Sequence, residues 1–170
     1  MNKVIWLTGL SGAGKTTIAT EVISLGLDLV LLDGDILRKG LCKDLQYTIS
    51  DRKENIRRVA EVAKLFIDNN KSCICSFISP TKQIRDLAKS IIGEENFIEI
   101  YVNTPFDVCE NRDPKGLYKL AKQGEIINFT GLDSVYEKPK KPDLTLDCYN
   151  NTVEKSSIIL YDYLKIMLNL

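Results

Sequence analysis

Residues 9–17, GLSGAGKTT, constrain the fold of this chain more than any other stretch. They follow the apolar run VIWLT and precede IATEVISLGL, which predicts a buried strand, a glycine-rich turn and a helix in that order. Gly9, Gly14, Lys15 and Thr16 match the phosphate-loop pattern, in which backbone N–H groups and a helix N-terminus surround phosphate oxygens. The lysine would reach the β- and γ-phosphates, and the threonine would bind Mg²⁺. We therefore expect a site for ATP and Mg²⁺ at Gly9, Ser11, Gly12, Ala13, Gly14, Lys15, Thr16 and Thr17.

Five short apolar runs alternate with helical stretches along the chain. We expect strands at residues 3–8, 27–33, 71–79, 96–103 and 143–148. This alternation predicts an α/β fold, a three-layer αβα sandwich of the P-loop NTPase type, with a mainly parallel five-stranded sheet and ligands at the carboxyl ends of the strands. The length suits a single domain, residues 1–170. Residues 112–142 have little periodicity, three prolines and three glycines, which indicates a lid.

Composition excludes several partners and mechanisms. Lys plus Arg and Asp plus Glu number 23 each, so no net positive charge favours nucleic acid or an anionic membrane, and we expect a small-molecule partner. The absence of histidine excludes Ser-His and Cys-His nucleophiles, so a base must be a carboxylate. Five scattered cysteines without a Cys-x-x-Cys pair, and no apolar run near the ~18 residues of a membrane span, indicate a soluble protein of the reducing cytoplasm.

Two carboxylates follow the second expected strand in LLDGDILR, residues 31–38. In this topology Asp33 and Asp35 would lie beside the phosphate loop, where Asp33 could bind Mg²⁺ together with Thr16, and Asp35 could accept a proton from an attacking hydroxyl. A kinase with a hydroxyl acceptor is the implied class. The alternative is that both residues solvate a turn and cap the next helix.

The clearest helix is expected to begin at Asp51, which could cap it, with Glu54 three residues later. Arg52 and Asn55 would then share a face of its first turn. Together with Arg38 and with Arg57 or Arg58, Arg52 would surround the same pocket and favour an anionic acceptor. Taken singly, each arginine could instead be a surface charge.

Six stretches in order resemble the adenylyl sulfate kinase family: GLSGAGKTT, LDGDILRKGL, SDRKENIRRVAEVAKLF, SFISP, CENRDPKGLYKLAKQGEI and NFTGLDSVYEKP. The resemblance runs from about residue 4 to residue 147. This family uses ATP to phosphorylate the 3′-hydroxyl of adenosine 5′-phosphosulfate. The resemblance therefore implies a phosphotransferase with an alcohol acceptor, and a homodimer.

The resemblance also implies a role for individual residues. Asp35 would contact the acceptor ribose as the candidate base, and Lys115 would reach in from the lid. Tyr47 and Phe129 would sandwich the acceptor base, an arrangement that tolerates any nucleobase. Ser79 matches a serine that forms a phosphoenzyme in some relatives; we interpret it as a binding residue, because direct transfer needs no covalent intermediate. The remaining implied contacts are Arg112 for ATP, and Arg38, Arg52, Asn55, Ile78 and Ser79 for the acceptor.

Two departures from the family pattern leave the acceptor base open. QYT at residues 46–48 stands where Gly-Phe-Ser is usual, and Asn128 stands where glycine is common. Amides at these positions could hydrogen-bond the edge of a pyrimidine. In this respect the chain resembles cytidine diphosphoramidate kinase, an enzyme of capsule synthesis. Neutral drift around an adenine site is the alternative.

Two further classes of protein also stay open. One is a non-catalytic, nucleotide-binding regulatory module, which the presence of Lys15, Thr16, Asp33 and Asp35 argues against. The other is a different small-molecule kinase, for a sugar acid or a nucleoside monophosphate, which DRKENIRR and FTG argue against.

Overall fold

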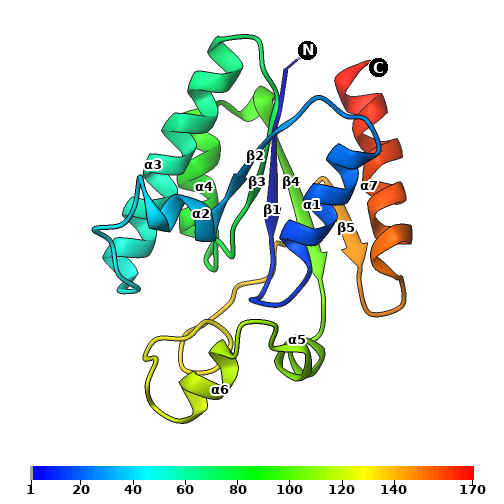
Figure 1. Ribbon diagram of the computed structural model, residues 1–170. Coiled ribbons are helices and arrows are strands. Elements are labelled where there is room, and N and C mark those ends of the chain that lie inside the picture. Colours follow the sequence, from blue (N-terminus) through cyan, green and yellow to red (C-terminus); the bar gives the residue numbers. More distant parts are fainter. Residues whose placement is uncertain (1) are drawn as a thin grey trace.

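The computed structural model describes residues 2–170 and shows three layers, with helices on both faces of one sheet (Figure 1). The strands are β1 (Val4–Thr8), β2 (Val30–Asp33), β3 (Cys73–Ser76), β4 (Phe97–Asn103) and β5 (Leu144–Asp147). They pair in the order β2-β3-β1-β4-β5, and every pairing is parallel. The expected αβα sandwich is confirmed.

The helices are α1 (Lys15–Ser24), α2 (Gly34–Lys39), α3 (Ile49–Asp68), α4 (Lys82–Ile92), α5 (Phe106–Arg112), α6 (Leu117–Lys122) and α7 (Val153–Leu168), with a 3₁₀ turn, η1, at Glu94–Asn96. None of the helices in residues 2–170 is both long and apolar enough to cross a bilayer.

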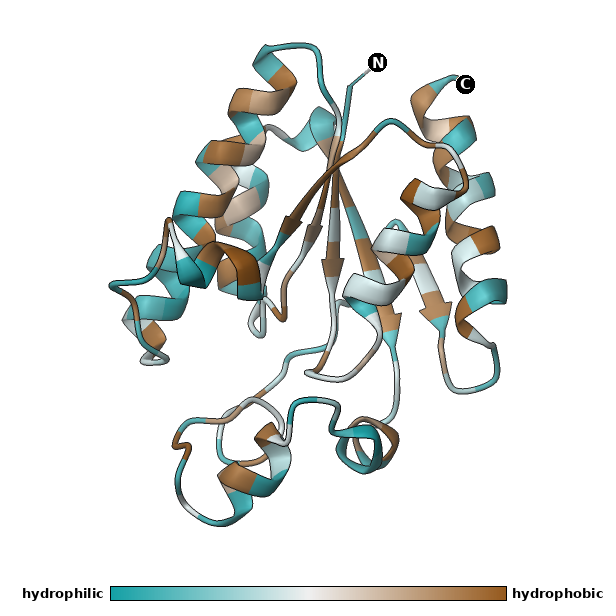
Figure 2. Ribbon diagram, in the orientation of Figure 1, coloured by the Kyte–Doolittle hydropathy of each residue, from teal (hydrophilic) through white to brown (hydrophobic). Residues whose placement is uncertain are grey.

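Alternation along β1 divides the core between the two faces of the sheet. Ile5 and Leu7 pack under α1 and α7, whereas Val4 and Trp6 pack under α3 and α4. All four side chains are fully buried, as expected for the central strand of a parallel sheet covered on both sides. Figure 2 shows the hydrophobic strands between helices that carry hydrophobic and hydrophilic stripes.

The observed strands are shorter than the apolar runs that predicted them. Leu27 and Leu29 are buried but precede β2, and a turn joins the N–H of Leu29 to the carbonyl of Leu27. The run at residues 71–79 forms a strand only as far as Ser76, and its remainder turns into the loop before α4. Hydrophobic runs therefore mark buried backbone, and pairing with a neighbouring strand decides where the strand ends.

The prediction that Asp51 caps the long helix is wrong. α3 begins at Ile49, and Thr48 caps it by accepting a hydrogen bond at its Oγ1 from the N–H of Asp51 (3.1 Å). Asp51 lies in the first turn, where its negative charge suits the helix dipole. Glu54 is bonded to arginines rather than to the cap.

Residues 112–142, the lid segment, lie across the carboxyl ends of the strands (Figure 1). The segment includes α6 and packs a buried tyrosine, Tyr118, whose hydroxyl donates to the carbonyl of Ser11 in the phosphate loop (2.8 Å). Its C-terminal part is held by the N–H of Glu137, which donates to the carbonyl of Pro80 (2.7 Å). The stretch with little periodicity thus contains a short helix and is hydrogen-bonded to the phosphate loop.

Candidate active site

The phosphate loop connects β1 to α1 and has close backbone packing. A Cβ on Gly9 would lie 2.7 Å from the carbonyl oxygen of Val102, so no larger residue fits there. Gly14 caps α1 with φ 101°, a left-handed conformation that favours glycine. Ala13 is buried, and its carbonyl accepts from Thr104 Oγ1 (2.8 Å). The contacts of Gly9 with Val102 and of Ala13 with Thr104 therefore fix the backbone of the phosphate loop.

Lys15 opens α1 and is 8% exposed. Its Nζ donates to the carbonyls of Gly9 (3.0 Å) and Leu10 (2.8 Å). Burial lowers the pKa of Lys15 to about 8. The ammonium is thus held inside the loop, where phosphate oxygens would be its natural partners.

Thr16 and Asp33 meet between α1 and the end of β2. Thr16 Oγ1 donates to Asp33 Oδ2 (2.7 Å) and lies 2.8 Å from Ser76 Oγ, at the end of β3. The other oxygen of Asp33, Oδ1, accepts from the N–H groups of Asp35 (2.9 Å) and Ile36 (3.2 Å), so Asp33 caps α2. The two interpretations of Asp33, as a helix cap and as a partner of Thr16 in a metal site, are therefore compatible, because Oδ1 caps α2 while Oδ2 faces Thr16.

Asp35 lies in the first turn of α2, beside the phosphate loop, and forms an ion pair with Lys115 of the lid segment. Both side chains are about half exposed. This contact joins the candidate base to residues 112–142.

Two arginines, Arg38 and Arg52, also line the cavity. Arg38 lies over the Tyr47 ring, 4.4 Å from its centroid. Arg52 donates from Nε to the Tyr47 carbonyl (3.0 Å) and from its terminal nitrogens to Thr130 Oγ1 and the Asn128 carbonyl. Arg52 therefore connects the start of α3 to the lid segment.

The prediction that Arg57 or Arg58 surrounds the pocket is wrong. Arg57 pairs with Glu54 and Glu61, and Arg58 pairs with Glu54 and Asp44. Neither arginine lines the cavity. Residues that follow Arg52 by five or six positions lie one and a half turns further along α3, beyond the first turn that faces the site.

Asn55 and Phe129 contribute buried surfaces to the cavity. The Asn55 side chain is buried and its Oδ1 has no hydrogen-bond partner among the residues that the structure describes, so this oxygen can accept from a ligand. Phe129 is buried and makes an edge contact with Tyr118 (4.8 Å between centroids). Tyr47, by contrast, is 55% exposed.

Ser79 is 1% exposed and has φ 45°. Its Oγ accepts from Trp6 Nε1 (2.9 Å), and its carbonyl accepts from Arg85 Nη1 (2.8 Å). Arg85 in turn pairs with Glu99 of β4 (2.8 Å). The hydroxyl of Ser79 is thus engaged with the core, which favours a binding and positioning role over that of a nucleophile.

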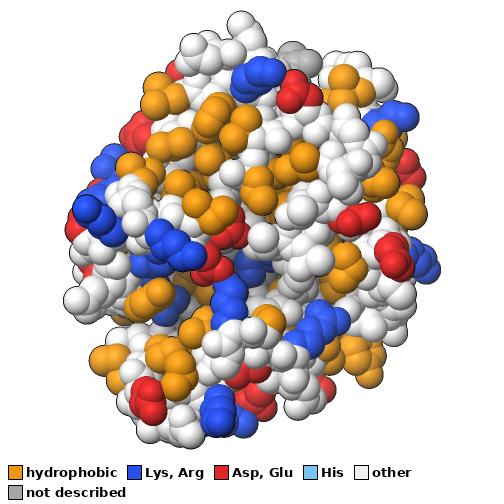
Figure 3. All heavy atoms as spheres, viewed as in Figure 1, with side chains coloured by type: hydrophobic (Ala, Val, Ile, Leu, Met, Phe, Trp, Pro, Cys, Tyr) orange, Lys and Arg blue, Asp and Glu red, His pale blue; other side chains and the backbone are white. Residues whose placement is uncertain are grey.

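One cavity of about 900 Å³ joins these elements. In Figure 3 basic and acidic side chains meet at the hollow between the sheet domain and the lid segment. Of the predicted residues, the cavity is lined by Ser11, Gly12, Gly14, Lys15, Thr16, Thr17, Asp33, Asp35, Arg38, Tyr47, Arg52, Asn55, Ile78, Ser79, Arg112, Lys115, Asn128 and Phe129.

Sequence reasoning missed several residues that line this cavity, among them Ser76, Thr130 and Val153. Ser76 could have been found, because it ends a strand beside the phosphate loop. Thr130 could also have been found, because it belongs to the FTG stretch of the resemblance, whereas Val153 had no such signal at the start of the last helix.

The parallel sheet, the phosphate loop and a second subsite in the same cavity define a P-loop kinase. A sequence model of the family described as adenylylsulphate kinase matches residues 1–147. The chain therefore belongs to the adenylylsulphate kinase family.

Individual relatives agree with this assignment. An adenylyl-sulfate kinase from Clostridium acetobutylicum is 51% identical over 166 residues, which is 95% of this chain and 82% of the relative. A solved APS kinase from Mycobacterium tuberculosis, in complex with AMPPNP and APS, superposes with a TM-score of 0.91 at 40% identity, over 96% of this chain and 98% of that one. A hexameric APS kinase from Thiobacillus denitrificans has a TM-score of 0.69 at 29% identity, over 99% of this chain and 29% of that one.

Proposed function

We propose that this protein transfers the γ-phosphate of ATP to the 3′-hydroxyl of adenylyl sulfate. The observation that carries the proposal is that one cavity is lined by Lys15, Thr16, Asp35, Arg38 and Arg52 together. Membership of the family supports the choice of acceptor.

In this reaction a bond forms between the 3′-oxygen and the γ-phosphorus, and the bond from that phosphorus to the ADP oxygen breaks. The hydroxyl proton passes to a carboxylate oxygen of Asp35, while Lys15 stabilises the charge on the phosphates. The ammonium of Lys15 is already inside the phosphate loop, which supports this role.

Thr16 and Asp33 are the residues that would hold Mg²⁺. A hydroxyl and a carboxylate oxygen 2.7 Å apart suit a hard cation that keeps several waters and is completed by phosphate oxygens. When bound, the ion would neutralise charge on the β- and γ-phosphates.

We further propose that residues 1–170 form one kinase domain with residues 112–142 as its lid. The contacts of Lys115 with Asp35 and of Arg52 with Asn128 support this role, because each joins the lid segment to an element of the acceptor subsite. Five buried free cysteines support the reducing cytoplasm as its location. The homodimer implied by the resemblance is part of the proposal, and light scattering of the purified protein tests it.

The cytidine alternative has little support. The relatives reported above are adenylyl-sulfate kinases. Asn128 has φ 59°, a left-handed conformation in which asparagine is the best-tolerated substitute for glycine, so the change needs no new acceptor. Gln46 lines the cavity with an exposed side chain and makes no side-chain contact that would explain its choice.

An ADP-release assay with ATP and Mg²⁺ tests the proposal by comparing kcat/KM for adenylyl sulfate and for cytidine 5′-diphosphoramidate. We expect adenylyl sulfate to be preferred by at least about a hundredfold, since a base pocket discriminates through several contacts at once. A preference for the phosphoramidate would overturn the proposed acceptor. Nucleotide binding without transfer to either compound would instead indicate a regulatory module.

A further inference from the structure

Residues 40–48, the acceptor loop, carry Tyr47 and Gln46 to the rim of the cavity. The loop connects α2 to α3 and contains no helix or strand. Cys42 is its one buried residue. Because so little apolar surface anchors it, polar contacts must hold the loop in place.

Three arginines supply these contacts by donating to backbone carbonyls of the loop. Arg38 donates to Leu45 (3.3 Å) and Gln46 (3.1 Å), and Arg52 donates to Tyr47 (3.0 Å). Arg58 donates to Leu41 (3.0 Å). Arg38 and Arg52 line the cavity, whereas Arg58 does not.

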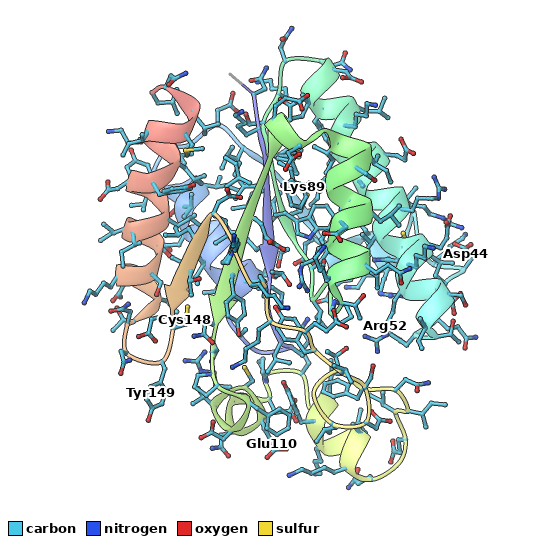
Figure 4. All side chains as sticks on the ribbon, turned by 180° about the vertical axis from the view of Figure 1, so that it is seen from behind. Asp44, Arg52, Lys89, Glu110, Cys148 and Tyr149 are labelled. Atoms are coloured by element: carbon cyan, nitrogen blue, oxygen red, sulfur yellow. The ribbon has the colours of Figure 1, made fainter. Side chains whose placement is uncertain are left out.

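Arg58 makes the most complete set of bonds. Its Nη1 and Nη2 form a fork on Asp44 of the loop (2.7 and 2.8 Å), and its Nε donates to Glu54 of the same helix (2.9 Å). A guanidinium bound to a carboxylate through two parallel N–H groups is fixed in direction as well as in distance. Figure 4 shows Asp44 beside α3, and Arg52 at the end of this helix nearest the lid segment.

The position of Arg58 outside the cavity distinguishes it from the other two arginines. Arg38 and Arg52 face the space of an anionic acceptor, so a bound acceptor competes with the loop for their N–H groups. The acceptor cannot compete for Arg58. The bonds of Arg58 to Asp44 and Leu41 therefore persist when the site is filled.

We propose that Arg58, through its fork on Asp44, is a positioning residue that fixes the acceptor loop and so holds Tyr47 as a wall of the acceptor subsite. This inference rests on the proposed function. It assigns Arg58 an effect on the acceptor rather than on ATP, because the bonds of Arg58 within residues 2–170 go to the acceptor loop and to α3 and not to the phosphate loop.

Arg57 provides a matched control. It neighbours Arg58 on α3 and also bonds to Glu54, but within residues 2–170 its one other partner is Glu61 of the same helix. Removing Arg57 therefore deletes a cation and a bond to Glu54 without touching the acceptor loop.

The test is steady-state kinetics of the full chain, with KM measured separately for adenylyl sulfate and for ATP. We expect Arg58→Ala and Asp44→Asn each to raise the KM for adenylyl sulfate about tenfold while the KM for ATP stays within about twofold. The double variant should be no worse than Arg58→Ala, because both changes remove the same interaction. Arg57→Ala should stay within about twofold of the unmodified protein for both substrates.

Hydrogen–deuterium exchange provides a readout that needs no substrate. Backbone amides of residues 40–48 should exchange faster in Arg58→Ala than in Arg57→Ala. Equal exchange in these two variants, or an equal rise in KM for both substrates, would overturn the positioning role. If Arg58→Ala does not fold, Asp44→Asn decides the question, since Asp44 is exposed and its side chain bonds to Arg58. An unmodified protein that fails to phosphorylate adenylyl sulfate would refute the proposed function instead, and exchange would still test Arg58.

Discussion

Lys115 of the lid segment and Asp35 of α2 form an ion pair, and both side chains line the cavity. The side chain that reaches in from the lid is thus bonded to the carboxylate proposed to accept the hydroxyl proton. An acceptor hydroxyl must share or displace this contact before it reaches Asp35. Because the two groups are 51% and 57% exposed, solvent screens the pair, and it contributes little to the stability of the fold.

Replacing Lys115 by alanine tests whether this lysine mainly binds the acceptor or whether its ion pair with Asp35 mainly inhibits the enzyme. We expect the KM for adenylyl sulfate to rise at least about tenfold, because the lysine is lost as a ligand for the anionic acceptor. The melting temperature should change by less than about 2 °C. A higher kcat/KM for the acceptor would contradict the prediction and show that the ion pair inhibits the enzyme.

Asp35→Asn should lower kcat at least about a hundredfold, because the amide cannot take up the hydroxyl proton. ATP binding, measured by titration calorimetry, should stay within about threefold, since Asp35 does not contact the phosphate loop backbone. Full activity in this variant would assign the base elsewhere.

The depressed pKa of Lys15 predicts a pH dependence. Only the charged ammonium binds phosphates well, so kcat/KM for ATP should fall as pH rises above about 8. The free energy of unfolding without nucleotide should rise between pH values of about 8 and 10.5, because there the unfolded chain binds more protons than the folded one. An ATP profile that is flat to about pH 9.5 would contradict the shift.

Asp33→Asn should weaken the binding of Mg²⁺ without unfolding α2. An asparagine oxygen can still accept from the N–H groups of Asp35 and Ile36, so the cap is kept. Loss of the negative charge should raise the Mg²⁺ concentration for half-maximal rate about tenfold. An unchanged Mg²⁺ titration would remove Asp33 from the proposed metal site.

Ser79→Ala should destabilise the fold more than it slows the reaction. The buried indole N–H of Trp6 would lose its acceptor, at a cost of about 1–3 kcal/mol in the free energy of unfolding. The value of kcat should remain within about tenfold, because transfer is direct. Denaturant unfolding and the ADP-release assay measure the two quantities. A loss of activity of about a thousandfold in a folded variant would favour a phosphoenzyme instead.

Much of the fold and the site followed from local sequence. The phosphate loop between β1 and α1, the carboxylates after β2 and the parallel five-stranded sheet were all predicted. The signals for them, which are the period of apolar residues, the spacing of glycines and the polar residues that end strands, each extend over only a few residues. The start of α3 was misplaced because Thr48 and Asp51 are both good caps, and the sequence did not rank them.

The sequence by itself determined the class of fold and the position of the phosphate loop, because these depend on interactions between near neighbours in the chain. Only the tertiary structure decided what each arginine does. Arg52 donates to a carbonyl of the lid segment, and Arg58 pairs with Asp44 outside the cavity. A long charged side chain bonds to whichever carboxylate or carbonyl the fold brings within its reach. The partners of Arg52 in the lid lie 76 and 78 residues away along the chain, so no local pattern encodes them.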